Sequence, residues 1–197
     1  MNIGIDIDDT ISLTYEATFP RAEKFVKNVL KRELELDYSK AFDHHFIKTV
    51  FKITEEEMDL FWKENLEEIL NEVEPKKNVA KIINKLKEEG HKIILITARW
   101  NSDYANSEKI SEKWLEKHGI QYDKMFIGLE NKAPKALEEK IDLFIDDSIR
   151  NYKEVSSVGI KSLLFKSEVN SRNEESKKLD MVNSWDEIYD RIKSGRI

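Results

Sequence analysis

The chain has 197 residues, no cysteine and a net charge of -6, from 33 Lys and Arg against 39 Asp and Glu. The lack of cysteine excludes disulfide scaffolds, thiolate zinc sites and cysteine nucleophiles, and favours a cytoplasmic protein. No apolar run approaches the roughly 20 residues that a membrane-spanning helix needs, and the negative charge disfavours binding to long nucleic acid.

Five short apolar segments predict five β-strands, at residues 2–5, 92–96, 124–127, 141–145 and 160–165. Segments of helical period lie between them, such as residues 79–89 and 104–118, each followed by a glycine. A capping-box pattern from Ser184 to Glu187 predicts a C-terminal helix. Strands that alternate with helices are typical of a parallel sheet covered on both faces, so we expect a three-layer α/β/α, Rossmann-like fold.

Residues 12–75 interrupt this alternation. The block is rich in charged and aromatic residues, with helical patterning at residues 22–34 and again after Thr54. Because it lies between the first two predicted strands, we expect an inserted helical unit that ends near Pro75. The predicted sheet domain is then discontinuous and consists of residues 1–11 and 76–197.

The first predicted strand runs into three carboxylates, because residues 6–10 read Asp-Ile-Asp-Asp-Thr. Carboxylates this close repel one another unless a cation lies among them, although a solvated acidic turn is the simpler alternative. Asp6 and Asp8 are two residues apart, so their side chains point the same way if the strand continues. This segment is therefore a candidate cation site.

A second acidic pair, Asp146 and Asp147, follows the predicted strand at residues 141–145. Ligands of open parallel sheets bind beyond the carboxyl ends of the strands, where both acidic segments are expected to meet. Oxygen ligands without His or Cys suit a hard cation of the Mg²⁺ type and make zinc and copper poor fits.

Two further segments offer groups that bind anions. Thr97, Ala98 and Arg99 follow the second predicted strand, where a hydroxyl and backbone N–H groups can hold a phosphate, although a threonine there more often belongs to a turn. Lys132 and Lys135 precede the strand that ends at the second acidic pair. Taken alone, either lysine is most simply a solvated surface residue.

In this order, the segments resemble the motifs of the haloacid dehalogenase superfamily of phosphatases. Residues 6–10 match the first motif, Ile-Thr-Ala-Arg at 96–99 the second, and Phe-Ile-Asp-Asp-Ser at 144–148 the fourth. The third motif is a lone lysine, for which we prefer Lys132 to Lys135 because of its distance from the last of these strands. Together with the helical block, the motifs are similar to those of bacterial nucleotidases related to 5'(3')-deoxyribonucleotidases.

The resemblance implies a HAD-like catalytic core at residues 1–11 and 76–197 and a small α-helical cap at residues 12–75. It also implies a phosphoric monoester hydrolase that depends on Mg²⁺. Asp6 would be the nucleophile that forms an aspartyl-phosphate, and Asp8 the general acid and then the general base. The Mg²⁺ would be held by Asp6, by the main-chain carbonyl of Asp8, and by Asp146 or Asp147.

The same resemblance assigns the transferring phosphoryl group to Thr97, Ala98 and Lys132. The expected substrate is a small phosphorylated metabolite, most simply a (deoxy)nucleoside monophosphate, so the activity would be that of a 5'-nucleotidase. No long nucleic acid and no membrane is expected as a partner. Two alternatives stay open: a phosphatase for another small metabolite such as a sugar phosphate, and a non-catalytic binding or regulatory protein that keeps the fold.

Three further features of the sequence involve aromatic or basic residues. Tyr15 or Phe19 would stack on a base, although aromatic residues of a cap helix more often belong to its core. Arg99 would contact the substrate or form a salt bridge within the sheet domain. His44 and His45 are adjacent and would point to opposite sides of an extended chain, so we expect no metal site that uses both.

Overall fold

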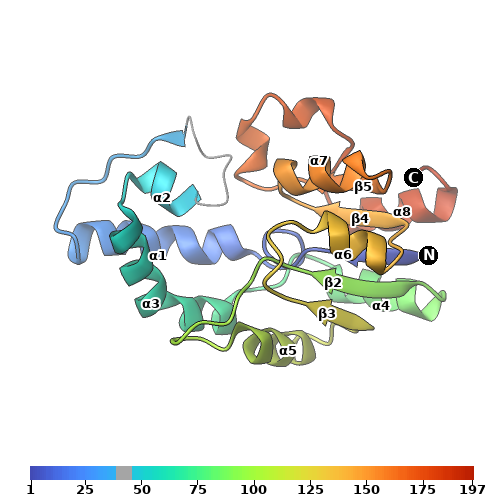
Figure 1. Cartoon of the computed structure of the whole chain (residues 1–197), viewed down its shortest axis with the longest axis horizontal. Coiled ribbons are helices and arrows are strands. Elements are labelled where there is room, and N and C mark those ends of the chain that lie inside the picture. Colours follow the sequence, from blue (N-terminus) through green and yellow to red (C-terminus); the bar gives the residue numbers. More distant parts are fainter. Residues whose placement is uncertain (39–45) are drawn as a thin grey trace.

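The computed structural model describes residues 1–38 and 46–197. Residues 39–45, with His44 and His45, lie outside the described part, so the expectation for this pair stays a prediction. Parallel strands form one sheet in the order β3-β2-β1-β4-β5-β6 (Figure 1). The strands are β1 Asn2–Ile5, β2 Lys92–Ile96, β3 Lys124–Phe126, β4 Leu143–Asp146, β5 Lys161–Phe165 and β6 Met181–Val182.

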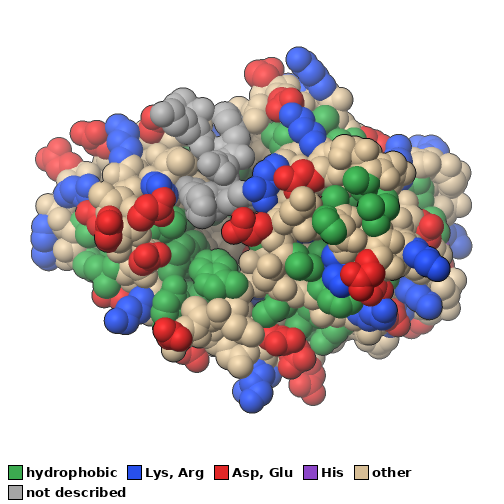
Figure 2. Space-filling model, viewed as in Figure 1, with side chains coloured by type: hydrophobic (Ala, Val, Ile, Leu, Met, Phe, Trp, Pro, Cys, Tyr) green, Lys and Arg blue, Asp and Glu red, His purple; other side chains and the backbone are tan. Residues whose placement is uncertain are grey.

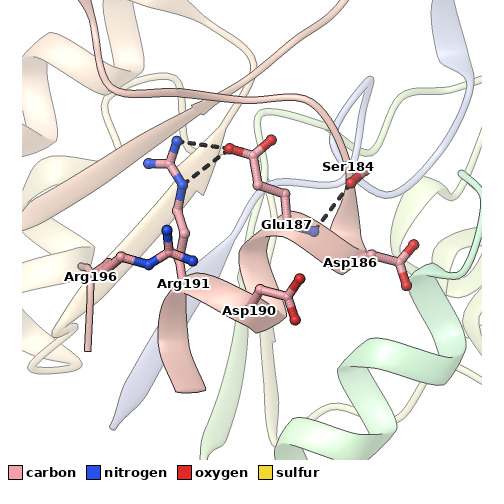
Figure 3. A pocket seen from close by; sticks show the side chains of 6 residues that line it. All are labelled: Ser184, Asp186, Glu187, Asp190, Arg191 and Arg196. Carbon is pink, nitrogen blue, oxygen red and sulfur yellow. Dashed lines mark hydrogen bonds and ion pairs between the residues drawn. The ribbon is translucent and has the colours of Figure 1, made fainter. Parts of the chain in front are cut away.

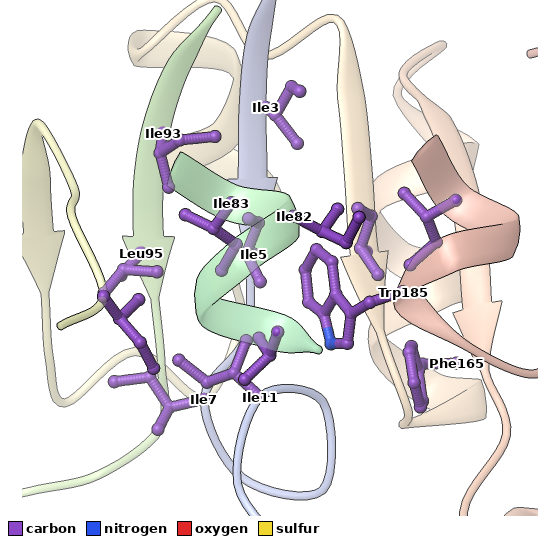
Figure 4. Packing of buried hydrophobic residues seen from close by; sticks show 14 of the residues in the cluster. Ile3, Ile5, Ile7, Ile11, Ile82, Ile83, Ile93, Leu95, Phe165 and Trp185 are labelled. Carbon is purple, nitrogen blue, oxygen red and sulfur yellow. The ribbon is translucent and has the colours of Figure 1, made fainter. Parts of the chain in front are cut away.

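Helices cover both faces of this sheet because successive side chains of each strand point to opposite sides. One face carries Ile3, Ile5 and Leu95, which pack against helices α4 (Val79–Glu88), α5 (Ser107–Lys117) and α8 (Trp185–Ser194). Figure 4 shows these strand side chains beside α4 and Trp185 of α8. The other face carries Ile94 and Phe144, which pack against α6 (Ala133–Glu138) and α7 (Ile149–Ser157). The expected three-layer α/β/α fold and its five predicted strands are confirmed. Strand β6 was missed because two residues are too short to show a period.

The C-terminal helix α8 anchors the loop that follows β1. Trp185 is completely buried, and its indole Nε1 donates a 3.0 Å hydrogen bond to the carbonyl oxygen of Thr10. The predicted start of the helix is confirmed: the Ser184 hydroxyl accepts from the backbone N–H of Glu187. The Glu187 carboxylate reaches back to the backbone N–H of Asn183. It also binds Arg191, as Figure 3 shows.

The helical block after β1 contains α1 (Thr14–Asn28), α2 (Phe46–Phe51) and α3 (Glu55–Glu72), which lie to one side of the sheet (Figure 1). Helix α1 begins eight residues before the predicted pattern at Ala22, because Pro20 lies inside the helix and hides its first turns from pattern analysis. The described helices share their own buried apolar cluster, which includes Ala22, Phe25, Ile47, Val50, Phe51, Phe61 and Ile69.

The block leaves and rejoins the sheet unit at one place. Ser12 and Pro75 form an antiparallel bridge, the N–H of Leu13 donates to the carbonyl of Glu74, and the N–H of Lys76 donates to the carbonyl of Ile11. The paired segments hold the two connections together. In the part of the chain that the structure describes, no helix is long and apolar enough to cross a membrane.

Candidate active site

The first acidic segment forms a tight turn at the carboxyl end of β1. The strand ends at Ile5, although the N–H of Asp6 still donates a 3.0 Å hydrogen bond to the carbonyl of Ile145 in β4. Asp9 then adopts a left-handed conformation with φ of 54°. The premise that the strand continues to Asp8 is therefore wrong, but the turn still brings Asp6 and Asp8 to the same cavity.

Lys132 joins the two acidic segments. Its Nζ donates to the carboxylates of Asp6 and Asp146, and its side chain is 2% exposed. Burial by itself would lower the pKa of Lys132, but the two carboxylates outweigh burial and raise it, so the amine stays protonated. Lys135 instead lies within α6 and pairs with Glu138 at the surface, so it does not join this cluster.

The carboxylates outnumber the positive charges that face them. Each of Asp6, Asp146 and Asp147 offers an oxygen within 4.8 Å of the others. Burial raises the pKa of Asp6 to about 7 against the opposing effect of Lys132. Burial also raises the pKa of Asp147 well above its ordinary value, with Asp9, Asp146 and Asp6 adding to the effect. Excess negative charge on an all-oxygen donor set fits a bound divalent cation.

Asp9 belongs to this cluster as well, although the sequence assigned it no role. Its Oδ1 accepts a 2.8 Å hydrogen bond from the backbone N–H of Tyr15 near the start of α1. Burial raises the pKa of Asp9 to about 7, while the Tyr15 N–H and Lys76 oppose the rise. Asp9 therefore ties the acidic turn to the helical block.

Asp8 has a different environment from the other carboxylates. Arg99 forms a two-point pair with it: Nε lies 2.9 Å from Oδ2 and Nη2 lies 2.7 Å from Oδ1. Burial by itself would raise the pKa of Asp8, but Arg99 and the Thr14 hydroxyl outweigh burial and hold the pKa below its ordinary value. Of the two roles open to Arg99, the structure shows the salt bridge.

A cavity of about 570 Å³ connects these groups. Thr97 and Ala98 line it where β2 ends, and the Thr97 hydroxyl also accepts from the N–H of Arg99. Apolar side chains of α3 form much of the remaining wall, together with Trp100 after β2. These side chains are Met58, Trp62, Leu66, Ile69 and Leu70.

The aromatic residues at this cavity differ from those expected. Tyr15 and Phe19 do not belong to its lining. They stack on each other, with ring centroids 5.1 Å apart, and Phe19 also contacts Phe51. Trp62 and Trp100 line the cavity instead. No local pattern in the sequence indicates this role for them, because only the packing of α3 beside the sheet brings the two tryptophans to one site.

The charge distribution on the surface does not indicate a particular class of ligand. On the face shown in Figure 2, acidic and basic side chains are interspersed rather than gathered by sign. A protein that follows a nucleic-acid backbone needs a continuous basic stripe instead. The cavity is therefore the expected place for a ligand.

The whole chain, residues 1–197, matches the family described as 5' nucleotidase, deoxy (pyrimidine), cytosolic type C protein. The chain belongs to this 5'-nucleotidase family. The chain is 28% identical to a nucleotidase of Clostridium acetobutylicum over 190 residues. This alignment covers 96% of this chain and 92% of the relative. A protein of Chlorobaculum tepidum, provisionally named a 5'(3')-deoxyribonucleotidase, is 27% identical over 129 residues, or 64% of this chain and 59% of that protein.

Solved structures of low sequence identity share the fold of this nucleotidase family member. A haloacid dehalogenase-like hydrolase of Streptococcus pneumoniae aligns with a TM-score of 0.65 at 12% identity over 97% of each chain. CbbY of Rhodobacter sphaeroides, solved with phosphate, aligns with a TM-score of 0.66 at 15% identity over 95% of each chain. The expected haloacid dehalogenase fold, the resemblance to nucleotidases and the assignment as a phosphoric monoester hydrolase are confirmed.

Proposed function

We propose that this phosphatase is a Mg²⁺-dependent 5'-nucleotidase that hydrolyses (deoxy)nucleoside monophosphates through an aspartyl-phosphate on Asp6. The observation that carries the proposal is the two-part lining of the cavity. Carboxylates and Lys132 supply groups for a metal ion and a phosphate, whereas α3 supplies an apolar wall with Trp62. The phosphate of a nucleotide suits the charged part of the lining, and its base suits the apolar wall.

The helical block has the features of a cap over this site. We propose that residues 12–75 form the cap and that residues 1–11 and 76–197 form the catalytic core. The paired connections at Ser12 and Pro75 and the separate apolar cluster of the block support this division. Helix α3 of the block lines the cavity, which is where substrate choice would be made.

Asp6 is the group that would attack phosphorus. It sits at the end of the central strand β1, and its bond to Lys132 helps to keep it ionised in a buried place. The new bond joins an Asp6 oxygen to phosphorus while the bond from phosphorus to the ester oxygen breaks. Asp8 would donate a proton to that ester oxygen and then accept a proton from the water that hydrolyses the aspartyl-phosphate.

Three groups would hold the transferring phosphoryl oxygens. Lys132 offers a buried positive charge, and Thr97 and Ala98 line the cavity at the end of the neighbouring strand β2. Charge spreads over these oxygens in the transition state, so fixed positive and hydrogen-bonding groups stabilise it. Lys132 would therefore serve both the nucleophile and the phosphate.

The metal site would use Asp6, the main-chain carbonyl of Asp8, and the acidic pair at the end of β4. When bound, Mg²⁺ offsets the repulsion between a carboxylate nucleophile and a phosphate dianion. Of the pair, we propose Asp147 as the direct ligand. Asp146 already accepts hydrogen bonds from Lys132, Asn151 and the N–H of Ser148. Asp147 has a hydrogen bond with the side chain of Ser167 but otherwise lies among carboxylates, without a cation beside it in the described residues.

The apolar wall favours a nucleotide over a sugar phosphate as substrate. Trp62 is partly buried and Trp100 is 45% exposed, so both indole rings have surface available to a ligand. Planar bases stack on aromatic rings, with about 1–3 kcal/mol for each base. A sugar phosphate would leave this wall without a matching apolar partner.

A panel of phosphate monoesters tests the proposal. Phosphate release would be measured for nucleoside 5'- and 3'-monophosphates and for sugar phosphates, each with Mg²⁺ and with a chelator. We expect kcat/KM to be highest for nucleoside monophosphates and activity to depend on Mg²⁺. Turnover confined to sugar phosphates would overturn the choice of substrate, and full activity in the chelator would overturn the metal requirement.

A further inference from the structure

Arg99 is a buried arginine whose guanidinium group is committed to a carboxylate. Its side chain is 3% exposed, and Nε and Nη2 approach the two oxygens of Asp8 at 2.9 and 2.7 Å. A planar guanidinium that binds a carboxylate through two N–H groups fixes both its position and its plane. This pairing restricts Asp8 more than a point charge would.

The guanidinium group is itself held in place. Its Nη1 donates a 2.9 Å hydrogen bond to the hydroxyl of Ser111, a completely buried residue of α5. The backbone N–H of Arg99 donates to the hydroxyl of Thr97. Arg99 is therefore connected to a core helix on one side and to the end of β2 on the other.

The two oxygens of Asp8 have unequal numbers of donors. Oδ1 accepts from Arg99 Nη2 and, at 2.7 Å, from the hydroxyl of Thr14, the first residue of α1. Arg99 Nε also lies 3.2 Å from Oδ1 but is closer, at 2.9 Å, to Oδ2. Oδ2 thus keeps an acceptor position, and the Asp8 side chain, which lines the cavity, is 33% exposed.

We propose that Arg99 is a positioning residue for proton transfer by Asp8. Arg99 and Thr14 immobilise Oδ1 and leave Oδ2 to carry the proton. As the bond between phosphorus and the ester oxygen breaks, its electron pair stays on that oxygen, the O–H bond at Oδ2 breaks and the hydroxyl of the product forms. This inference rests on the proposed function, because it takes Asp8 as the general acid.

The test compares two leaving groups. A deoxynucleoside 5'-monophosphate leaves an alkoxide that needs a proton, whereas 4-nitrophenyl phosphate leaves an anion that is stable without one. The kcat/KM value reports steps only up to the first irreversible one, phosphoryl transfer, so later hydrolysis of the enzyme intermediate does not mask the difference. In Arg99→Ala we expect kcat/KM to fall about 100-fold for the nucleotide and less than about 5-fold for 4-nitrophenyl phosphate.

Graded variants keep the test independent of folding. Arg99→Lys keeps the charge but loses the two-point geometry, so its kcat/KM for the nucleotide should lie between those of wild type and Arg99→Ala. Ser111→Ala removes one support of the guanidinium and should change the substrate ratio in the same direction by a smaller factor. Arg21→Ala, which removes a surface pair with Glu68 and Glu72, should leave the ratio unchanged.

Thermal unfolding monitored by circular dichroism would accompany each variant. If folded Arg99→Ala loses kcat/KM equally on both substrates, the inference is overturned, and Arg99 has a phosphate-binding or purely structural role. If Arg99→Ala does not fold, the same comparison is made with Arg99→Lys. Asp6→Asn separates the two proposals. If it keeps full activity, the proposed function fails; if it is inactive while the substrate ratio of the Arg99 variants is that of wild type, only this inference fails.

Discussion

Nζ of Lys132 donates a 2.7 Å hydrogen bond to Oδ2 of Asp146, and neither side chain is more than 2% exposed. The same ammonium group binds Asp6, so one buried cation connects the ends of the neighbouring strands β1 and β4. A buried charge is tolerated when its partners and hydrogen bonds satisfy it, and removal of one partner leaves the others exposed to a large desolvation penalty. The connection has consequences for both stability and activity.

Replacing Lys132 by methionine should affect both properties. We expect the free energy of unfolding at neutral pH, without metal, to fall by about 3–5 kcal/mol, because Asp6 and Asp146 lose their cation. Phosphate release should fall at least about 100-fold. Urea unfolding and a phosphate assay measure the two effects. Lys135→Met, which removes the pair with the exposed Glu138 and the contact of Nζ with the Phe126 ring, should cost less than about 1 kcal/mol; similar effects of the two variants would contradict the account.

Trp62→Ala should alter substrate preference. Loss of a stacking surface should raise the KM for nucleoside monophosphates about 10-fold, while the KM for glycerol 3-phosphate, which has no base, should stay within about 2-fold of the wild-type value. Steady-state kinetics on the two substrates measure the difference. Leu60→Ala is the matched control on the same helix, since Leu60 is 39% exposed and does not line the cavity. Parallel changes on both substrates would argue against base stacking.

Gly4 allows a close approach between the two central strands. A Cβ at this position would lie 2.6 Å from the ring of Phe144, so Gly4→Ala should lower the free energy of unfolding by about 1–3 kcal/mol. Denaturant unfolding gives the value. A smaller side chain opposite should relieve the clash, so the alanine should be better tolerated in a Phe144→Leu background. An unchanged penalty in that background would mean that the ring is not the cause.

Glu187 should make the free energy of unfolding depend on pH in the acid range. Burial would raise its pKa, but the Asn183 backbone N–H, the Asn183 side chain and Arg191 outweigh burial and lower it. Its contribution is therefore present above the ordinary pKa of 4.5 and is lost as the pH falls through the lowered value. Glu187→Gln should reduce stability by less than about 1 kcal/mol at neutral pH, and by nothing in strong acid.

Denaturant unfolding of wild type and Glu187→Gln at several acidic pH values tests whether the stabilisation by Glu187 is lost as the pH falls. Glu174→Gln is a suitable control, because that carboxylate is 84% exposed and pairs only at the surface with Lys177 in the structure. Its effect should stay near zero throughout the range. A difference between wild type and Glu187→Gln that grows as the pH falls would contradict the expected direction.

Much of the candidate site could be predicted because parallel strands bring their carboxyl ends to one edge. Asp6 and Thr97 follow β1 and β2, Asp146 is the last residue of β4, and these three strands are neighbours in the sheet. Apolar runs of four or five residues were enough to locate the strands. The order of polar residues after them then indicated which side chains would meet.

Features that depend on helix packing could not be predicted in this way. Trp62 lies on α3 and Trp100 after β2, and no local period relates the two positions. The expected base-stacking residues, Tyr15 and Phe19, became part of an aromatic cluster with Phe51 because the described helices of the block pack on each other. The pairing of Arg99 with Asp8 stayed open because it depends on side-chain direction as well as on strand order.

The central claim is that Asp6 carries the phosphoryl group in a reaction that needs Mg²⁺. Its most direct test is phosphate release from a deoxynucleoside monophosphate by wild type and by Asp6→Asn, which nearly conserves the size of the side chain. We predict Mg²⁺-dependent turnover by the wild type and a loss of at least about 1,000-fold in the variant, since its amide is a poor nucleophile. Comparable turnover by Asp6→Asn would contradict the account.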